Sequence, residues 1–380
     1  MTIITFGEED AKALSWVASG AENSDPGAVL IIDVDGTDSK ARVSTNTAAL
    51  IRSMVISVDD AQDESIALRA KTLASIASKV EEGVNLTLTT NGDKVSVACG
   101  ATSLNLTNLY DHVMDVTRRL HRDRVATVTT EKFIESMVNA GAASSKEEVI
   151  LDFEDDLVTV GARNDRIHTQ ELYPASVYDT PPPLRIIGGH LKVMKPLAKL
   201  EFVGALDIFV GTGYVIFRAP VDDPESHIRD ISMVVPTVVS GSALDSSPCD
   251  EDVTPSLSVS RSLLRGALAP LSGAVESYSV VTMTFDADGQ LVVSVASNEG
   301  TGKTTILDAK VNTPGTIEVL LGDLTTALRS ITDSEVNIGE TAIEDDTWVT
   351  VTPVDEDDDS EDDDTMYSGG DIIVAIRSQS

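Results

Sequence analysis

One stretch of the sequence carries residues that could bind a nucleotide phosphate. Gly300-Thr-Gly-Lys-Thr-Thr305 combines glycines, a lysine and hydroxyl groups, as phosphate-binding loops do. The complete motif needs a glycine five residues before Gly302, but Ser297 stands there. The stretch also lies between two predicted strands rather than between a strand and a helix. We therefore predict an ordinary loop, and an ATPase activity would depend on Lys303 alone.

Two aspartate-rich segments have the beginning of a calcium-binding loop. Asp33-Val-Asp-Gly36 and Asp286-Ala-Asp-Gly289 lack the later ligands and the closing glutamate of such a loop. Since Asp-Gly is common in tight hairpin turns, we predict turns at both places. The five histidines lack metal-ligand spacing, and no triad signature is present. We therefore expect no enzymatic activity, no metal and no cofactor.

Length and composition limit the class of protein. The chain has 380 residues, 42% hydrophobic residues and a formal net charge of −34. It is too long for a single core, so we expect two or three domains. We expect neither a signal peptide nor a transmembrane helix, because the sequence has no suitable apolar run. Cys99 and Cys249 are the only cysteines, which favours a reducing compartment, the cytoplasm.

The acidic residues are concentrated in part of the chain. Nine of the ten residues at 355–364 are acidic. A strand-like apolar pattern follows at Ile372–Ile376, so residues 355–371 are predicted to form an acidic hairpin insertion. On average charge alone, the protein should repel nucleic acid.

An internal repeat organises the remaining sequence. Apolar residues with helical spacing recur about every 60 residues, and pairs of alternating strands follow most of these segments. The predicted helices are Glu8–Ala18, Arg69–Val80, Thr130–Asn139, His190–Leu200, Val259–Leu271 and Leu320–Ile331. Pairing the six copies predicts an α+β fold of three similar domains, each with two helices packed on antiparallel sheets. The expected domains are 1–120, 121–245 and 246–380.

The predicted helices have the opposite charge balance to the rest of the chain. They carry 11 of the 28 basic residues but only six of the 62 acidic residues. The basic residues are Lys12, Arg69, Lys71, Lys79, Lys132, Lys192, Lys195, Lys199, Arg261, Arg265 and Arg329. One interpretation is that helices simply favour Lys and Arg. The other is a basic, helix-lined surface that attracts phosphates within an acidic protein.

This pattern resembles a known family. In the first expected domain, Ser65–Val80 leads through a helix into strands that include Lys94–Val97. The segments Leu184–Met194 and Leu257–Leu264 begin similar units in the other two domains. The order resembles that of the bacterial-type DNA polymerase sliding clamp, the replicase beta subunit. The match is one of pattern and spacing over most of the chain.

The resemblance implies a function without catalysis. In that family two three-domain chains join head to tail into a homodimeric ring whose helices line a hole around DNA. The basic helix residues would then contact double-stranded DNA without reading its sequence. The ring would tether the replicative polymerase and so confer processivity during DNA replication. Its partners would be a DNA polymerase and a clamp loader, bound through short peptide motifs, with no membrane involved.

The resemblance also implies two protein interfaces. The family's partner pocket has a loop that usually reads Thr-Asp-Gly-His-Arg-Leu, matched here by Ala162–Ile167, and a chain end that closes it. The residues carried over are Arg166, Ile167, Val374, Ile376 and Arg377. The expected ring-contact residues are Leu104, Leu106, Leu271 and Val275. The departures from the usual loop favour a divergent, phage-encoded clamp with its own partners.

An alternative belongs to another class of protein. A repetitive, β-rich structural or assembly protein of a virion would use the same sheets for self-association. It would have a stoichiometry set by a particle, and no loader or polymerase would bind it.

Overall fold

The computed structural model describes most of the chain. The described residues are 2–19, 28–46, 51–58, 62–91, 94–110, 123–143, 148–191, 194, 196–197, 204–221, 226–239, 248–250, 253–273, 275–297, 300–331, 333–343, 346–354 and 373–379. Contacts divide it into two compact units, each considered separately. The first comprises residues 1–134, 175–181 and 192–238, and the second 135–174, 182–191 and 239–380.

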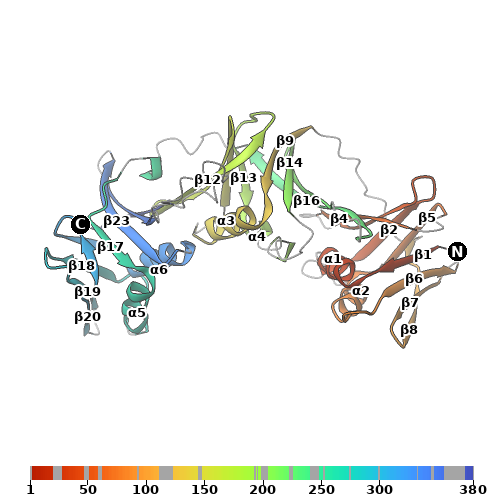
Figure 1. Ribbon diagram of the computed structural model, residues 1–380, viewed down its shortest axis with the longest axis horizontal. Helices are drawn as coiled ribbons and strands as arrows, with labels where there is room; N and C mark the ends of the chain where they lie inside the picture. The colour runs from red at the N-terminus through yellow and green to blue at the C-terminus, as the bar shows by residue number, and fades with distance from the viewer. Residues whose placement is uncertain are drawn as a thin grey trace, which may run out of the picture. The chain divides into compact units, whose positions relative to one another are not determined.

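A strand, a helix and three further strands form a module that occurs six times along the chain (Figure 1). The first two copies are β1 (Ile3–Phe6), α1 (Glu8–Ser19), β2 (Val29–Asp35), β3 (Lys40–Asn46) and β4 (Ile51–Ser57), then β5 (Glu64–Arg69), α2 (Ala70–Ala77), β6 (Leu86–Asn91), β7 (Lys94–Cys99) and β8 (Thr102–Thr107). The next two are β9 (Arg124–Thr129), α3 (Thr130–Ala143), β10 (Glu148–Glu154), β11 (Leu157–Arg163) and β12 (Ile167–Val177), then β13 (Leu184–Ile187), α4 (Gly188–Leu191), β14 (Ala205–Gly211), β15 (Tyr214–Pro220) and β16 (Ile228–Val239).

The last two copies complete the chain. They are β17 (Leu257–Ser260), α5 (Arg261–Ser272), β18 (Val280–Phe285), β19 (Leu291–Ser297) and β20 (Gly300–Ile306), then β22 (Gly315–Leu320), α6 (Leu321–Ser330), β23 (Glu335–Ile343), β24 (Asp346–Pro353) and β25 (Ile373–Arg377). Two short elements lie outside the module, η4 (Pro248–Asp250) and β21 (Ala309–Val311).

The modules are joined in pairs by exchange of their leading strands. β1 pairs with β6 of the second copy, and β5 pairs with β2 of the first. The same reciprocal exchange occurs between β9 and β14, β13 and β10, β17 and β23, and β22 and β18. Since each copy takes a strand from its neighbour, no copy forms its sheets alone.

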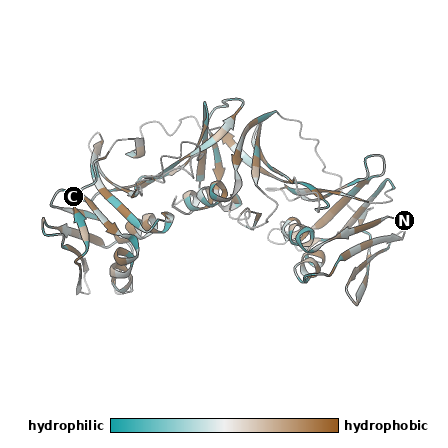
Figure 2. Cartoon of the chain, in the orientation of Figure 1, coloured by the Kyte–Doolittle hydropathy of each residue, from teal (hydrophilic) through white to brown (hydrophobic). Residues whose placement is uncertain are grey.

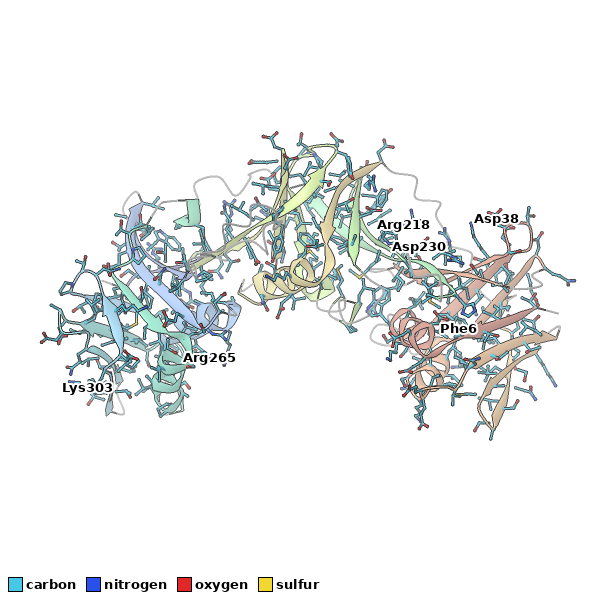
Figure 3. All side chains as sticks on the ribbon, viewed as in Figure 1. Phe6, Asp38, Arg218, Asp230, Arg265 and Lys303 are labelled. Carbon is cyan, nitrogen blue, oxygen red and sulfur yellow. The ribbon has the colours of Figure 1, made fainter. Side chains whose placement is uncertain are left out.

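In the first unit, two antiparallel sheets enclose an apolar core. One has the order β1-β6-β7-β8, and the other, here called the first long sheet, runs β5-β2-β3-β4-β16-β15-β14-β9. Helices α1 and α2 pack against each other (Figure 1). Phe6, labelled in Figure 3, is completely buried, and so is Leu14. Arg52 is buried, and it donates a hydrogen bond of 2.6 Å to the Trp16 carbonyl near the end of α1. Burial lowers the pKa of Arg52 to about 10.

The second unit is built in the same way. Its second long sheet runs β13-β10-β11-β12-β25-β24-β23-β17-β21, and a smaller sheet runs β20-β19-β18-β22. Side chains of α5 and α6 fill the core with residues of both sheets. Figure 2 shows hydrophobic residues along the strands and on parts of each helix, as alternation and helical spacing require.

Both long sheets cross an expected domain boundary. β4 of the first expected domain pairs with β16 of the second, and β12 of the second pairs with β25 of the third. Consequently the two compact units divide the middle expected domain between them. The domain boundaries drawn from the sequence stay a prediction.

The predicted helices are found with small shifts at their ends, apart from the fourth. α4 ends at Leu191, before Pro196, although the pattern predicted a helix over His190–Leu200. The prediction for Gly300–Thr305 was also wrong, because these residues lie in edge strand β20 rather than in a loop. Lys192, Lys195, Lys199 and the predicted insertion at 355–371 lie outside the described residues.

Candidate nucleic-acid interface and partner site

A groove of about 410 Å³ runs between α5 and α6 in the second unit. Leu268 and Leu328 line it, while Arg265 and Arg329 stand on the two helices as exposed cations. Figure 3 labels Arg265 on α5 and Lys303 on β20. Within the described part of the chain, neither arginine of the groove forms an ion pair. Two cations on adjacent helices can contact successive phosphates of a nucleic acid.

Helix α2 supplies a comparable surface in the first unit. Its buried side is formed by Leu73, Ala74 and Ala77, and its sequence contains no acidic residue. Arg69, immediately before the helix, and Lys71 and Lys79 are exposed. Lys132 on α3 is also exposed.

Two of the predicted basic residues are in a different electrostatic setting. Lys12 forms ion pairs with Glu8 at 3.0 Å and with Glu9. Hydrogen bonds to Glu9 and then Glu8 raise the pKa of Lys12. Arg261 is half-buried and donates a hydrogen bond to the Ile331 carbonyl at the end of α6. These two residues therefore have less capacity to contact phosphates than Arg265 and Arg329.

The second long sheet carries a hollow of about 680 Å³, here called the arginine hollow. Four arginines line it, namely Arg163, Arg166, Arg185 and Arg377. Glu148, Asp165 and Asp346 also line it, and Ile150, His168 and Trp348 contribute apolar and aromatic surface. Arg185 lies 3.6 Å from Glu148, and Arg377 forms an ion pair with Asp346.

The expected partner-pocket residues separate into two groups. Arg166 and Arg377 line the arginine hollow. Ile167, Val374 and Ile376 are buried in the core among residues of α5 and α6, and they do not line the hollow. Sequence reasoning missed Arg163, Arg185 and Trp348, because only the pairing of strands brings them to one place.

The turn between β11 and β12 is tied to α6. Arg166, in this turn, lies 3.6 Å from Asp323 in the first turn of α6. Asp323 is 5% exposed, and its Oδ2 atom has no hydrogen-bond partner. Burial raises the pKa of Asp323, and the charge of Arg166 opposes this shift.

The expected ring-contact residues lie near two sheet edges. β8 is an edge strand of the first unit, where Leu104 is 43% exposed and Leu106 half-buried. β20 is an edge strand of the second unit. Leu271 packs against Gly302 of this strand, and Val275 packs against the same core as Leu271. Each unit therefore has an unpaired strand edge bordered by apolar side chains.

Among the residues that the structure describes, no group of three or more His, Cys, Asp or Glu side chains could hold a metal ion. In the same residues, no helix is long and apolar enough to span a membrane.

No protein-family model and no curated protein matches this chain. Solved structures match its whole length. A sliding clamp (DNA polymerase III subunit beta) from Pseudomonas aeruginosa, bound to griselimycin, is 14% identical with a TM-score of 0.77, covering 100% of this chain and 99% of that chain. The beta subunit from Thermotoga maritima is 12% identical with a TM-score of 0.74, covering 100% of both chains. The chain has the sliding-clamp fold.

A third match supports the same fold. A putative DNA polymerase III beta subunit from Eubacterium rectale is 14% identical with a TM-score of 0.72, covering 100% of this chain and 99% of that chain. The α+β prediction and the resemblance to sliding clamps are therefore confirmed at the level of the fold. At identities of 12–14%, these structures show a likeness in fold.

Proposed function

We propose that the protein is a DNA sliding clamp and not an enzyme. Two copies would form a closed ring around double-stranded DNA and tether a replicative polymerase, to which a clamp loader would deliver it. The observation that carries this proposal is the set of exposed cations on α2, α5 and α6 in a chain of net charge −34 with the sliding-clamp fold.

The proposed mechanism is topological. Arg69, Lys71, Lys79, Lys132, Arg265 and Arg329 would contact phosphates, with lesser contributions from Lys12 and Arg261. Such contacts carry no base-sequence information, so the ring could slide. The acidic residues of the sheets and loops would disfavour DNA binding outside the ring. Lys192, Lys195 and Lys199 belong to the same proposed surface.

Ring closure would join the free edges of β8 and β20 from two copies. Leu104, Leu106, Leu271 and Val275 would border that joint, and pairing would satisfy backbone groups that an edge leaves open. We place the protein in the cytoplasm at sites of replication, in an infected host if a phage encodes it. No observation favours the virion alternative.

The test is retention on DNA of different topology. The protein is dissociated at high salt, reassembled by dilution with nicked circular plasmid, and separated by gel filtration. We expect it to co-elute with the circle and to be lost after a restriction enzyme linearises the plasmid. Equal retention on circular and linear DNA would contradict the topological mechanism.

A further inference from the structure

The arginine hollow concentrates cations in an acidic protein. Four of the chain's 16 arginines line it, although acidic residues outnumber basic residues by 62 to 28. The side chains of Arg166, Arg185 and Arg377 are 52%, 39% and 43% exposed. Such half-exposed guanidinium groups can donate hydrogen bonds to a carboxylate of a ligand. Their planar, forked geometry matches the two oxygens of a carboxylate.

One ion pair of the hollow is long enough for a ligand to replace it. Arg185 and Glu148 have an N–O distance of 3.6 Å, longer than a charge-assisted hydrogen bond. A ligand carboxylate bound to Arg185 would form a shorter contact than Glu148 does.

The hollow lies on the opposite face of the sheet from the helices of the second unit. His168 pairs with Arg163 and with Ala375, whereas Ile167 pairs with Ile376. Paired residues point to the same face and successive residues to opposite faces. Since Ile167 and Ile376 are buried with α5 and α6, the hollow faces away from those helices. A ligand there leaves Arg265 and Arg329 accessible.

The lining favours a peptide over a nucleic acid. The rings of His168 and Trp348 are 4.8 Å apart, and both residues line the hollow with Ile150. These groups suit an apolar side chain placed between carboxylates.

We propose that the arginine hollow binds an acidic segment of a partner protein in which carboxylates flank an apolar side chain. This inference rests on the proposed function, because it gives the chemistry of the segment that would tether the partner.

The direct test is binding of a fluorescein-labelled peptide, Glu-Asp-Leu-Phe-Asp-Glu, to the intact protein, measured by fluorescence anisotropy. We expect saturable binding that weakens with salt, and at least tenfold weaker binding of Gln-Asn-Leu-Phe-Asn-Gln. The double variant Arg185→Gln/Arg377→Gln should bind the acidic peptide at least tenfold more weakly. Arg218→Gln is the matched control, because Arg218 is 46% exposed and pairs with Asp230 at 3.1 Å in the other unit (Figure 3).

Two further measurements separate loss of the site from misfolding. The variant Arg185→Glu/Arg377→Glu should gain binding of Lys-Lys-Leu-Phe-Lys-Lys, which an unfolded protein would not do selectively. In a Trp16→Phe background, Trp348 is the single tryptophan, and its emission should change on saturation with the acidic peptide. Equal binding of the acidic and amide peptides, or equal effects of the hollow variant and Arg218→Gln, would overturn the proposal.

The same assay distinguishes other occupants and the ring mechanism. A short DNA duplex that displaces the acidic peptide would assign the hollow to nucleic acid and overturn the inference. Neither the peptide-binding measurement nor the displacement by DNA requires the protein to form a ring around DNA. If the protein is retained equally on circular and linear DNA but still binds the acidic peptide, the clamp function is rejected and the peptide site is not.

Discussion

At the residue scale, Asp323 provides a test of buried charge. Its raised pKa means that the folded protein holds this proton more tightly than the unfolded chain, whose ordinary value is 3.8. Ionised Asp323 therefore costs stability above its folded pKa, and this cost disappears as pH falls to the unfolded value. We expect Asp323→Asn to raise the free energy of unfolding at pH 7, with a smaller gain near pH 4, measured by urea denaturation.

Arg166 supplies the matched control for that prediction. Arg166→Gln should lower stability by no more than about 1 kcal/mol at pH 7, because the arginine is half exposed. The same change should have no effect in the Asp323→Asn background. An equal loss in both backgrounds would show that Arg166 acts on stability without Asp323.

Sequence reasoning reached these residues only partly. Arg166 was selected by its match to a family loop, and the structure places it in the turn before β12. Asp323 is one of the six acidic residues in the predicted helices, and no local pattern indicates its burial or its contact with Arg166 in a distant turn. Ile167 and Arg166 are adjacent, and only the strand register decides that one enters the core and the other stays exposed.

At the element scale, two glycines should respond oppositely to alanine. A Cβ on Gly339 in β23 would lie 2.6 Å from Val253 Cγ1 and 3.0 Å from the Thr254 carbonyl oxygen, so Gly339→Ala should destabilise by about 1–3 kcal/mol. Gly266 in α5 has nothing within 4 Å of that position, so Gly266→Ala should stabilise by about 0.5–1 kcal/mol. Thermal denaturation of both variants measures this difference, and a shift of the same sign in both would contradict it.

The groove between α5 and α6 makes an electrostatic prediction. Arg265→Gln/Arg329→Gln should weaken retention on circular DNA and lower the slope of log affinity against log salt by about two. The reason is the loss of one phosphate contact per arginine. Lys310→Gln is the control, since Lys310 is 77% exposed on β21 and does not line the groove. Equal slopes in both variants would remove the groove from the DNA-binding surface.

The elements themselves were largely predictable. Helical apolar spacing located α1, α2, α3, α5 and α6, because each helix buries one face. α4 was overestimated, since its apolar pattern continues beyond the point where the helix ends. The position of Gly300–Thr305 between two predicted strands favours a loop, whereas pairing with β19 makes these residues part of strand β20.

At the scale of the whole molecule, the prediction concerns the number of chains. Native mass spectrometry should find two copies in the assembly. Leu104→Arg should yield single chains that remain folded, because this side chain is already 43% exposed in one copy. Leu157→Arg is the matched control, at 38% exposure on β11, and should keep the assembly intact. An unchanged mass for Leu104→Arg would remove β8 from the ring contact.

The repeat was visible in the sequence, but the connections between its copies were not. The recurrence of helical apolar segments and the alternation along the strands predict six modules, since both are local properties of the chain. The pairing of β4 with β16 and of β12 with β25 joins residues far apart in the sequence, and no local pattern encodes it. This long-range pairing joins strands of neighbouring expected domains, and the compact units therefore do not follow the expected boundaries, which stay a prediction.

The exchange of leading strands has a consequence for synthesis. Ile3 of β1 lies opposite Thr89 of β6, so β1 leaves the ribosome long before its partner exists. The first module must wait with open sheet edges, which are liable to aggregate, until the second is complete. We therefore expect the nascent chain to become protease-resistant in steps of two modules, and truncations within a pair to be insoluble.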